Sequence, residues 1–347
     1  MSPKKTLLFF VSLSIGLAVF FLIGGEAGWG KVIQSLSLIK AWQFFLITLF
    51  FLAGIETAVW VWKMILAYLG VQSNFLTLNK AFLAGFTVSY LTPITLVGGE
   101  ALRLYLLNEK LNVSWEKGIS SIIVNKMLDF VVLLAFVISG LAAFFLRGGA
   151  FSQKVGSLLV FSLGVIIFFF VYLFFRGAKK KSVIRELLRI IRLDDLLETP
   201  RGQKFLRYEE EVLGFFNIHN RYFWKIIGLT FIQHLFWLIQ ALLIVLFLVG
   251  SLKGFTGPLI VYSFAALGSV LFIPAALGSL EIVEGIAFMA LGAPYSVAVV
   301  FSLIWRGTRL ALCFFGSFCF LSLAKEVILN YFTKDKNRFK KLWKIKK

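Results

Sequence analysis

Ionisable residues lie inside some of the most apolar segments of this 347-residue sequence. Glu100 and Arg103 are three residues apart, directly after Gly98 and Gly99. A charged side chain at the centre of a membrane costs roughly 2.5 to 3.5 kcal/mol even on the lenient insertion scale. Glycine pairs also weaken the helix, and broken backbone in hydrocarbon is tolerated only where it is buried in protein or lines a wet cavity. We therefore expect the stretch 92–103 to line a site.

A second acidic pair lies in a later apolar segment. Glu281 and Glu284 share a helix face with no basic residue close by in the sequence, so they need a cation, a proton or water to balance them. Arg306 and Arg309 are the partners that the following segment offers. Such a cluster either locks helices together or leaves the arginines to bind a phosphate, for which the planar guanidinium is a bidentate donor.

Lys126 and Asp129 form another pair three residues apart, with the same two interpretations: a local ion pair or part of a ligand site. Other polar residues in the apolar segments favour packing or interhelical hydrogen bonds over ligand binding. These are Glu56, Lys63, Gln233 and His234.

Composition sets the class of protein. The chain is 59% hydrophobic and 15% charged, with a mean hydropathy of +0.89, which predicts an all-α polytopic membrane protein. The net charge of +19 arises mainly in the segment 176–222 and the tail 325–347, so anionic inner-leaflet lipid is the expected partner and nucleic acid is not. Two cysteines and two histidines predict neither a metal site nor a disulfide framework, and no cofactor is expected.

The apolar runs predict six full transmembrane helices and two interrupted segments. If the interrupted segments are re-entrant helical hairpins, both termini are cytoplasmic. The eleven Lys and Arg of 176–221 and the nine of 325–347 then also lie in the cytoplasm, as the positive-inside rule requires. We thus expect a transmembrane domain over 1–324 with a cytoplasmic amphipathic insertion at 176–222, and a basic cytoplasmic tail over 325–347. The six runs are 6–23, 41–64, 118–146, 155–175, 223–249 and 297–324, and the interrupted ones are 80–107 and 258–291.

The two interrupted segments resemble each other. Pro93 precedes Glu100 by seven residues, and Pro274 precedes Glu281 by seven, with glycine between, Gly278 in the second case. The basic residues of the following spans continue the offset of 180 or 181 residues. We expect two repeats, about 80–146 and 258–324, inverted relative to each other because three full spans separate them. The hairpins would then approach each other from opposite faces of the membrane.

These residues resemble the flippase-like membrane domain of lysylphosphatidylglycerol synthases. The similarity is carried by 98–103 (GGEALR), 125–129 (NKMLD), 274–281 (PAALGSLE) and Arg306. It implies a bacterial or archaeal cell (inner) membrane protein, whose domain in full-length synthases moves aminoacylated lipid between leaflets. Asn125-Lys126 departs from the Glu-Arg often found in the family. The soluble aminoacyltransferase domain is missing, so we do not expect this chain to make lysyl-lipid by itself.

The leading hypothesis is a lipid translocase that passes a phospholipid or lipid-linked headgroup through a polar cleft. The alternatives are a membrane-embedded transferase acting on a lipid-linked sugar or aminoacyl group, and a non-catalytic membrane partner of a separate synthase. No catalytic residue is predicted. The predicted lipid-contacting residues are Gly98, Gly99, Glu100, Arg103, Lys126, Asp129, Pro274, Gly278, Glu281, Glu284, Arg306 and Arg309.

Overall fold

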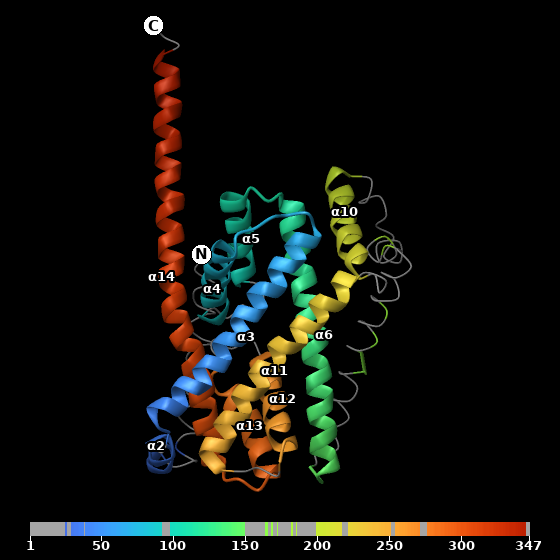
Figure 1. Ribbon diagram of the computed structural model, residues 1–347, viewed down its shortest axis with the longest axis vertical. Coiled ribbons are helices and arrows are strands. Elements are labelled where there is room, and N and C mark those ends of the chain that lie inside the picture. Colours follow the sequence, from blue (N-terminus) through green and yellow to red (C-terminus); the bar gives the residue numbers. More distant parts are fainter. Residues whose placement is uncertain are drawn as a thin grey trace.

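The computed structural model describes the chain in seven long stretches, with a few single positions described between them. Every regular element in these stretches is a helix, and no strand occurs in them, which confirms the all-α prediction. Figure 1 shows the helices as an elongated bundle. The stretches are residues 29–37, 39–91, 98–149, 199–216, 221–250, 254–270 and 276–344.

Four helices are long and apolar enough to cross a membrane. The shortest of these segments has 28 residues, which at 1.5 Å per residue reach about 42 Å, more than the roughly 30 Å of hydrocarbon. They correspond to four of the six predicted spans, whereas 6–23 lies outside the described residues and 155–175 almost entirely so. The four are α3 (Ala41–Tyr68), α6 (Trp115–Leu146), α11 (Arg221–Val249) and the first part, Tyr295–Ser322, of α14 (Tyr295–Lys344).

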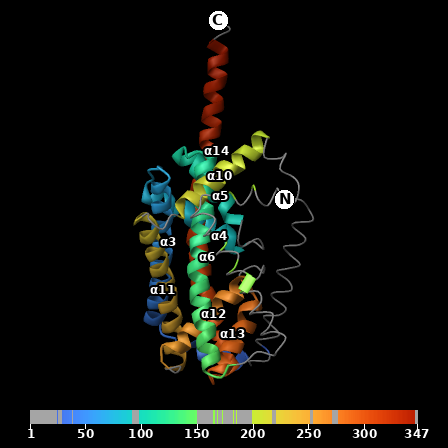
Figure 2. The same cartoon turned by 90° about the vertical axis from the view of Figure 1, so that its right-hand side faces the viewer.

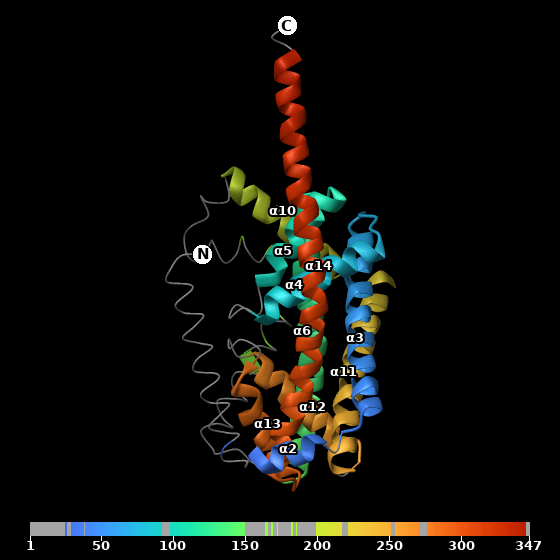
Figure 3. The same cartoon turned by 90° about the vertical axis from the view of Figure 1, so that its left-hand side faces the viewer.

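Two pairs of shorter helices occupy the interrupted segments. α4 (Phe75–Leu91) packs against α5 (Gly98–Leu111), and α12 (Thr256–Val270) packs against α13 (Ser279–Ala290). Each of these helices has 17 residues or fewer, too few to span hydrocarbon alone. Figures 1 and 3 show α4 and α5 in the upper half of the bundle and α12 and α13 in the lower half. The connections at 92–97 and 271–275, with both prolines of the predicted repeat, lie outside the described residues.

The first pair approaches closely because both helices carry glycine at the contact. A Cβ built on Gly99 would lie 1.8 Å from the carbonyl oxygen of Gly85, so only glycine fits at this distance. Ser89 lies one turn further along α4 and accepts a hydrogen bond of 3.0 Å from the Gly99 N–H. Small residues allow such close approach of helix backbones in membranes. The contact fixes the start of α5, and with it the position of Glu100.

The long helices enclose both pairs. α3 packs along α11, and each short pair contacts three long helices: the first pair contacts α3, α6 and α14, and the second contacts α6, α11 and α14. Helices α3 and α6 are each followed by a glycine in the left-handed region, Gly70 at φ 73° and Gly148 at φ 78°, which ends them without strain. The short helix α2 (Trp29–Ser37) lies at the lower end against α14.

Helix α10 and the C-terminal part of α14 are not part of the four membrane-length segments. α10 (Pro200–Phe215) begins at Pro200, where Thr199 Oγ1 accepts a hydrogen bond of 3.1 Å from the Gly202 N–H, and it packs against α6. Figure 2 shows α10 at the same end of the bundle as α5. α14 continues as one helix to Lys344 and projects past the other helices, so the predicted tail is helical over 325–344.

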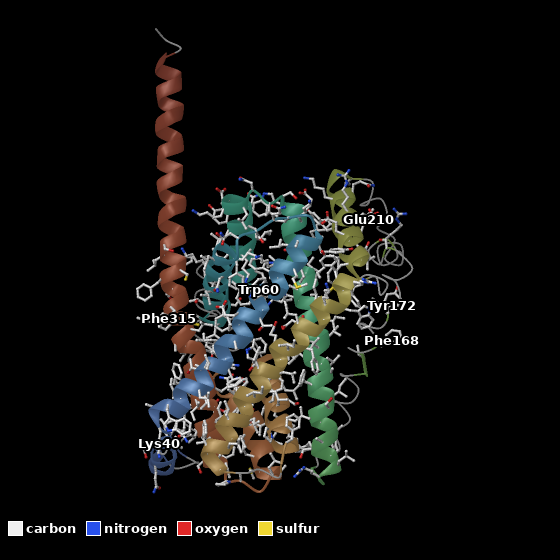
Figure 4. All side chains as sticks on the ribbon, viewed as in Figure 1. Lys40, Trp60, Phe168, Tyr172, Glu210 and Phe315 are labelled. Carbon is white, nitrogen blue, oxygen red and sulfur yellow. The ribbon has the colours of Figure 1, made fainter. Side chains whose placement is uncertain are left out.

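The lateral surface of the bundle is apolar. Large apolar side chains are exposed along the long helices, among them Trp60 and Phe315, which are 47% and 63% exposed. Figure 4 places both between Lys40 near one end of the bundle and Glu210 near the other. Because water would penalise so much exposed apolar surface, this surface suits a hydrocarbon solvent.

Candidate functional site

A cavity of about 220 Å³ lies where the two short helix pairs meet. Its walls come from both pairs and from the long helices α6 and α14. Several of the residues are polar or charged, which is unusual inside an apolar bundle. The lining residues are Phe86, Ser89, Tyr90, Glu100, Arg103, Lys126, Ser269, Ala276, Leu280, Trp305 and Arg309.

Glu100 is the carboxylate of this cavity and lies in the first turn of α5. Its Oε1 is 2.7 Å from Lys126 Nζ and 3.7 Å from Arg103 Nη1. Its Oε2 accepts a hydrogen bond of 3.2 Å from the Ser89 hydroxyl. The Glu100–Arg103 proximity predicted from their spacing is therefore present, and a second cation reaches the same oxygen from α6.

Arg103 is a buried cation held by aromatic rings. The centre of its guanidinium lies 3.7 Å from the Phe82 ring centroid and 5.6 Å from that of Trp62. A cation over an aromatic face is attracted by the ring quadrupole, and the attraction is strongest where water is excluded. The rings therefore fix Arg103 in the cavity wall, with Nη1 directed toward Glu100.

Arg309 brings a further cation to the cavity from α14. Its guanidinium lies 3.8 Å from the Trp305 ring centroid and 4.8 Å from that of Phe51, and its Nη1 donates a 2.7 Å hydrogen bond to the Trp305 carbonyl. Among the residues that the structure describes, no carboxylate forms an ion pair with Arg309. The described wall thus carries three cationic side chains and one carboxylate, an arrangement that favours an anionic group such as a phosphate.

Glu281 and Arg306 form a separate buried ion pair rather than lining the cavity. Arg306 Nη2 lies 2.8 Å from Glu281 Oε1, and the same nitrogen donates to the Ala276 carbonyl at 3.2 Å. Glu281 Oε2 also accepts a 3.0 Å hydrogen bond from the Gly278 N–H and so caps α13. Ala276, whose carbonyl accepts from Arg306, and Leu280, which precedes Glu281, do line the cavity. The pair joins the start of α13 to α14.

Comparison with known proteins places this arrangement in a family. A family model described as "Lysylphosphatidylglycerol synthase TM region" matches residues 9–316, a range that contains every residue of the cavity. The chain belongs to this family. The match confirms the resemblance found in the sequence.

Two relatives of this chain are archaeal proteins named UPF0104 membrane protein. The one from Methanocaldococcus jannaschii is 26% identical over 326 residues, which cover 87% of this chain and 90% of that protein. The one from Methanothermobacter thermautotrophicus is 28% identical over 206 residues, covering 58% of this chain and 55% of its own length. With the four membrane-length helices, these similarities identify a multi-pass membrane protein.

Lys126 and Asp129 contact different partners in the structure. Lys126 reaches across to Glu100, whereas Asp129 Oδ1 accepts a 2.8 Å hydrogen bond from Gln233 Nε2 and lies 3.2 Å from His234 Nε2. His234 Nδ1 in turn lies 2.6 Å from the Tyr262 hydroxyl. The predicted interhelical role of Gln233 and His234 is present, because this network joins α6, α11 and α12.

Arg309 also differs from the sequence expectation. We expected it beside Arg306 as a partner of the acidic pair, but it contacts Trp305 of its own helix and Phe51 of α3. Residues three apart are neighbours on a helix, but the two guanidinium groups have different partners, because Arg309 Nη1 donates to the carbonyl of Trp305 in its own helix. Arg306 faces α13, and Arg309 faces the cavity and α3.

The remaining predicted residues lie at the starts of α5 and α13, within α13, or outside the described residues. Gly98 begins α5, Gly278 precedes α13 at φ 78°, and Glu284 is buried within α13, while Pro274 lies outside the described residues. Ser89 and Trp305 line the cavity but were not predicted as site residues from the sequence. Ser89 had one available signal, since it is the last serine or threonine before the interrupted stretch begins at Thr92.

Proposed function

We propose that this protein is an integral membrane lipid translocase, which moves a phospholipid or lipid-linked headgroup between leaflets through the cavity. The observation that carries the proposal is the excess of cationic side chains at the junction of the two helix pairs, with Arg309 held on aromatic rings. A headgroup phosphate would supply the anion that this wall favours. The family description names a synthase of an aminoacylated phospholipid, which supports a lipid as the substrate class.

The three cations would serve the headgroup differently. Arg103 and Arg309 are fixed by rings, so they offer preorganised donors for phosphate oxygens. The Lys126 side chain is 41% exposed and reaches Glu100 through a flexible stem. When a phosphate arrives, it replaces the Glu100 carboxylate as the partner of Lys126. When the phosphate leaves, Lys126 pairs with Glu100 again. The bound phosphate thus offsets part of the excess positive charge of the cavity, and Glu100 balances Lys126 when the phosphate is absent.

We further propose that each short helix pair is a re-entrant hairpin and that the two halves are an inverted repeat. The Glu100–Lys126 contact of 2.7 Å has a counterpart in the Glu281–Arg306 contact of 2.8 Å, displaced by 181 and 180 residues. Each joins a short helix to the long helix that follows it. Rocking of one such unit against the other is a known way for a central site to face either side in turn.

The proposal is tested by lipid exchange in proteoliposomes. Phospholipid with a fluorescent headgroup label is reconstituted in both leaflets, and a membrane-impermeant quencher reports how fast the inner pool becomes accessible. Arg309→Gln removes one charged donor, worth about 1.5 to 3 kcal/mol, so exchange should slow about ten- to hundredfold.

Lys63→Gln is the matched control. Lys63 is also a cation within a long helix, but it lies over the Trp60 ring at 4.8 Å and does not line the cavity. Its exchange rate should equal that of the unaltered protein. Exchange that is unchanged in Arg309→Gln, with both variants folded, would exclude the cavity as the lipid path.

A further inference from the structure

Glu284 is a buried carboxyl group with an exposed fraction of 0%. Within the part of the chain that the structure describes, neither of its carboxyl oxygens has a hydrogen-bond partner. It does not line the cavity, and it forms no ion pair with any residue that the structure describes. Its situation differs from that of Glu281, one turn earlier on α13, which is paired with Arg306.

The register of α13 against α14 shows which way Glu284 faces. Glu281 contacts Arg306, and the Phe288 ring lies 5.6 Å from the Phe301 ring. Residues 281, 284 and 288 lie on one face of a helix, so Glu284 lies between these two contacts and faces α14. On α14, between Phe301 and Arg306, Ser302 is fully buried, and its hydroxyl also has no hydrogen-bond partner.

The surrounding charges do not balance an ionised Glu284. Helix α12, which packs on α13, contains no Asp, Glu, Lys or Arg, and its one titratable side chain, Tyr262, contacts His234. On α14 the nearest cation in the register is Arg306, which Glu281 already holds, and Arg309 faces the cavity. The nearest carboxylate on its own helix is Glu281, whose negative charge opposes a second one.

We infer that Glu284 is a proton-binding site, in which the carboxylate takes up one proton and becomes a neutral carboxyl group. An ionised carboxylate sealed in protein without a partner costs several kcal/mol, whereas a neutral carboxyl group costs only what any buried polar group costs. In the lipid-translocase proposal on which this role rests, movement of the unit that contains α13 and α14 against the other unit admits water to Glu284 and releases the proton. Proton supply would then bias the position of the α12–α13 pair.

Infrared spectroscopy of the purified protein in bilayers tests the proton directly. With ¹³C in the side-chain carboxyl of glutamate, the C=O band of a protonated glutamate shifts away from the bands of other groups. Near neutral pH the unaltered protein should show such a band, and Glu284→Gln should lose it. Glu56→Gln is the matched control, because Glu56 accepts hydrogen bonds of 2.7 Å from Asn79 at both oxygens, and this variant should keep the band.

Three results would overturn the inference: no protonated-glutamate band in the unaltered protein, a band that survives in Glu284→Gln, or a band that appears only when sodium ions are removed. The last would indicate a bound sodium ion instead. If Glu284→Gln does not fold, Glu284→Asp, which keeps an acid but removes the labelled glutamate, should lose the band. A band that survives there would assign the proton to another glutamate.

A transport measurement tests the coupling. An imposed pH gradient should change the exchange rate of the unaltered protein severalfold, and in Glu284→Gln the ratio of rates with and without the gradient should fall to one. A protein that shows the band but exchanges no lipid contradicts the translocase alone. A protein that exchanges lipid without showing the band contradicts the proton site alone.

Discussion

In both short helix pairs, a glutamate in the first turn of the second helix meets a cation from the long helix that follows. In the first pair the cation is Lys126, whose side chain is 41% exposed, and the contact borders the cavity. In the second pair it is Arg306, whose side chain is 5% exposed, and Glu281 is fully buried. The same ion pair is thus open to a ligand in one half of the chain and sealed in the other.

The neighbouring residues explain the difference. Three positions after each glutamate stands Arg103 in the first pair and Glu284 in the second, so the first site gains a cation where the second gains an acid. The start of α5 is capped from outside by Ser89, whereas α13 is capped by Glu281 itself. We infer that the first pair serves binding and that the second holds α13 against α14.

The largest expected effect is on stability, in Arg306→Met. Removing one partner of a sealed ion pair leaves an uncompensated charge, so the free energy of unfolding should fall by about 3 to 5 kcal/mol. Lys126→Met at the open pair should lower it by at most about 1 kcal/mol, because Glu100 keeps Arg103 and Ser89 and water screens the site. Unfolding in mixed detergent micelles measures both.

A double variant separates the ion pair from mere loss of packing. Glu281→Gln with Arg306→Met removes both charges and should recover most of the stability lost in the single variant. If the double variant is as unstable as the single one, the buried charge is not the cause. Equal losses in Lys126→Met and Arg306→Met would show that the two pairs do not differ.

Sequence spacing predicted these pairs only in part. Apolar length predicted α3, α6, α11 and α14, and the interruptions at glycine and proline predicted the short pairs. Spacing within one helix also predicted that Glu100 lies near Arg103. These features are local, or depend on the length of hydrocarbon to be crossed, so the chain alone carries them.

Contacts between helices were not predictable in the same way. A spacing of three residues predicts that Lys126 and Asp129 share a helix face, but it does not predict which helices pack against that face. Lys126 meets α5, while Asp129 meets Gln233 on α11. Likewise Arg309 lies on Trp305 and Phe51 because the direction in which it leaves α14 depends on where α3 packs.

An intermediate effect is expected where helix backbones touch. In Gly99→Ala the new Cβ would lie 1.8 Å from the Gly85 carbonyl oxygen, so α5 must move from α4, at about 1 to 3 kcal/mol. In Gly268→Ala, at the contact of the second pair, the nearest atom, Leu280 Cα, is 3.1 Å away and a smaller loss is expected. Because Gly99 adjoins Glu100, the first change should also slow lipid exchange, and by more than Gly268→Ala, which adjoins the cavity-lining Ser269.

Gly228→Ala is the control for helix propensity. Gly228 lies inside α11, and a Cβ there would meet nothing within 4 Å, so its replacement should leave stability unchanged or raise it by up to about 1 kcal/mol. A loss in Gly268→Ala as large as that in Gly99→Ala would contradict the tighter contact in the first pair.

The smallest expected effect concerns the external cap of α5. Ser89→Ala removes the acceptor for the Gly99 N–H and a donor to Glu100, which should lower the free energy of unfolding by about 1 kcal/mol. Ser269→Ala is the matched control, because Ser269 also lines the cavity but donates only to the Ala265 carbonyl within its own helix. In the unaltered protein Ser89 accepts from the Gly99 N–H, so Glu100 does not need to cap α5. In Ser89→Ala the Glu100 carboxylate should turn back to cap α5, as Glu281 caps α13. Lys126 would then lose its partner, and lipid exchange should show a weaker dependence on the charge at position 126. That dependence is measured as the ratio of the exchange rates with Lys126 and with Lys126→Met. The ratio is determined once with Ser89 present and once in the Ser89→Ala variant. An unchanged ratio would mean that the cap and the cavity are independent, and that the two helix pairs differ in burial alone.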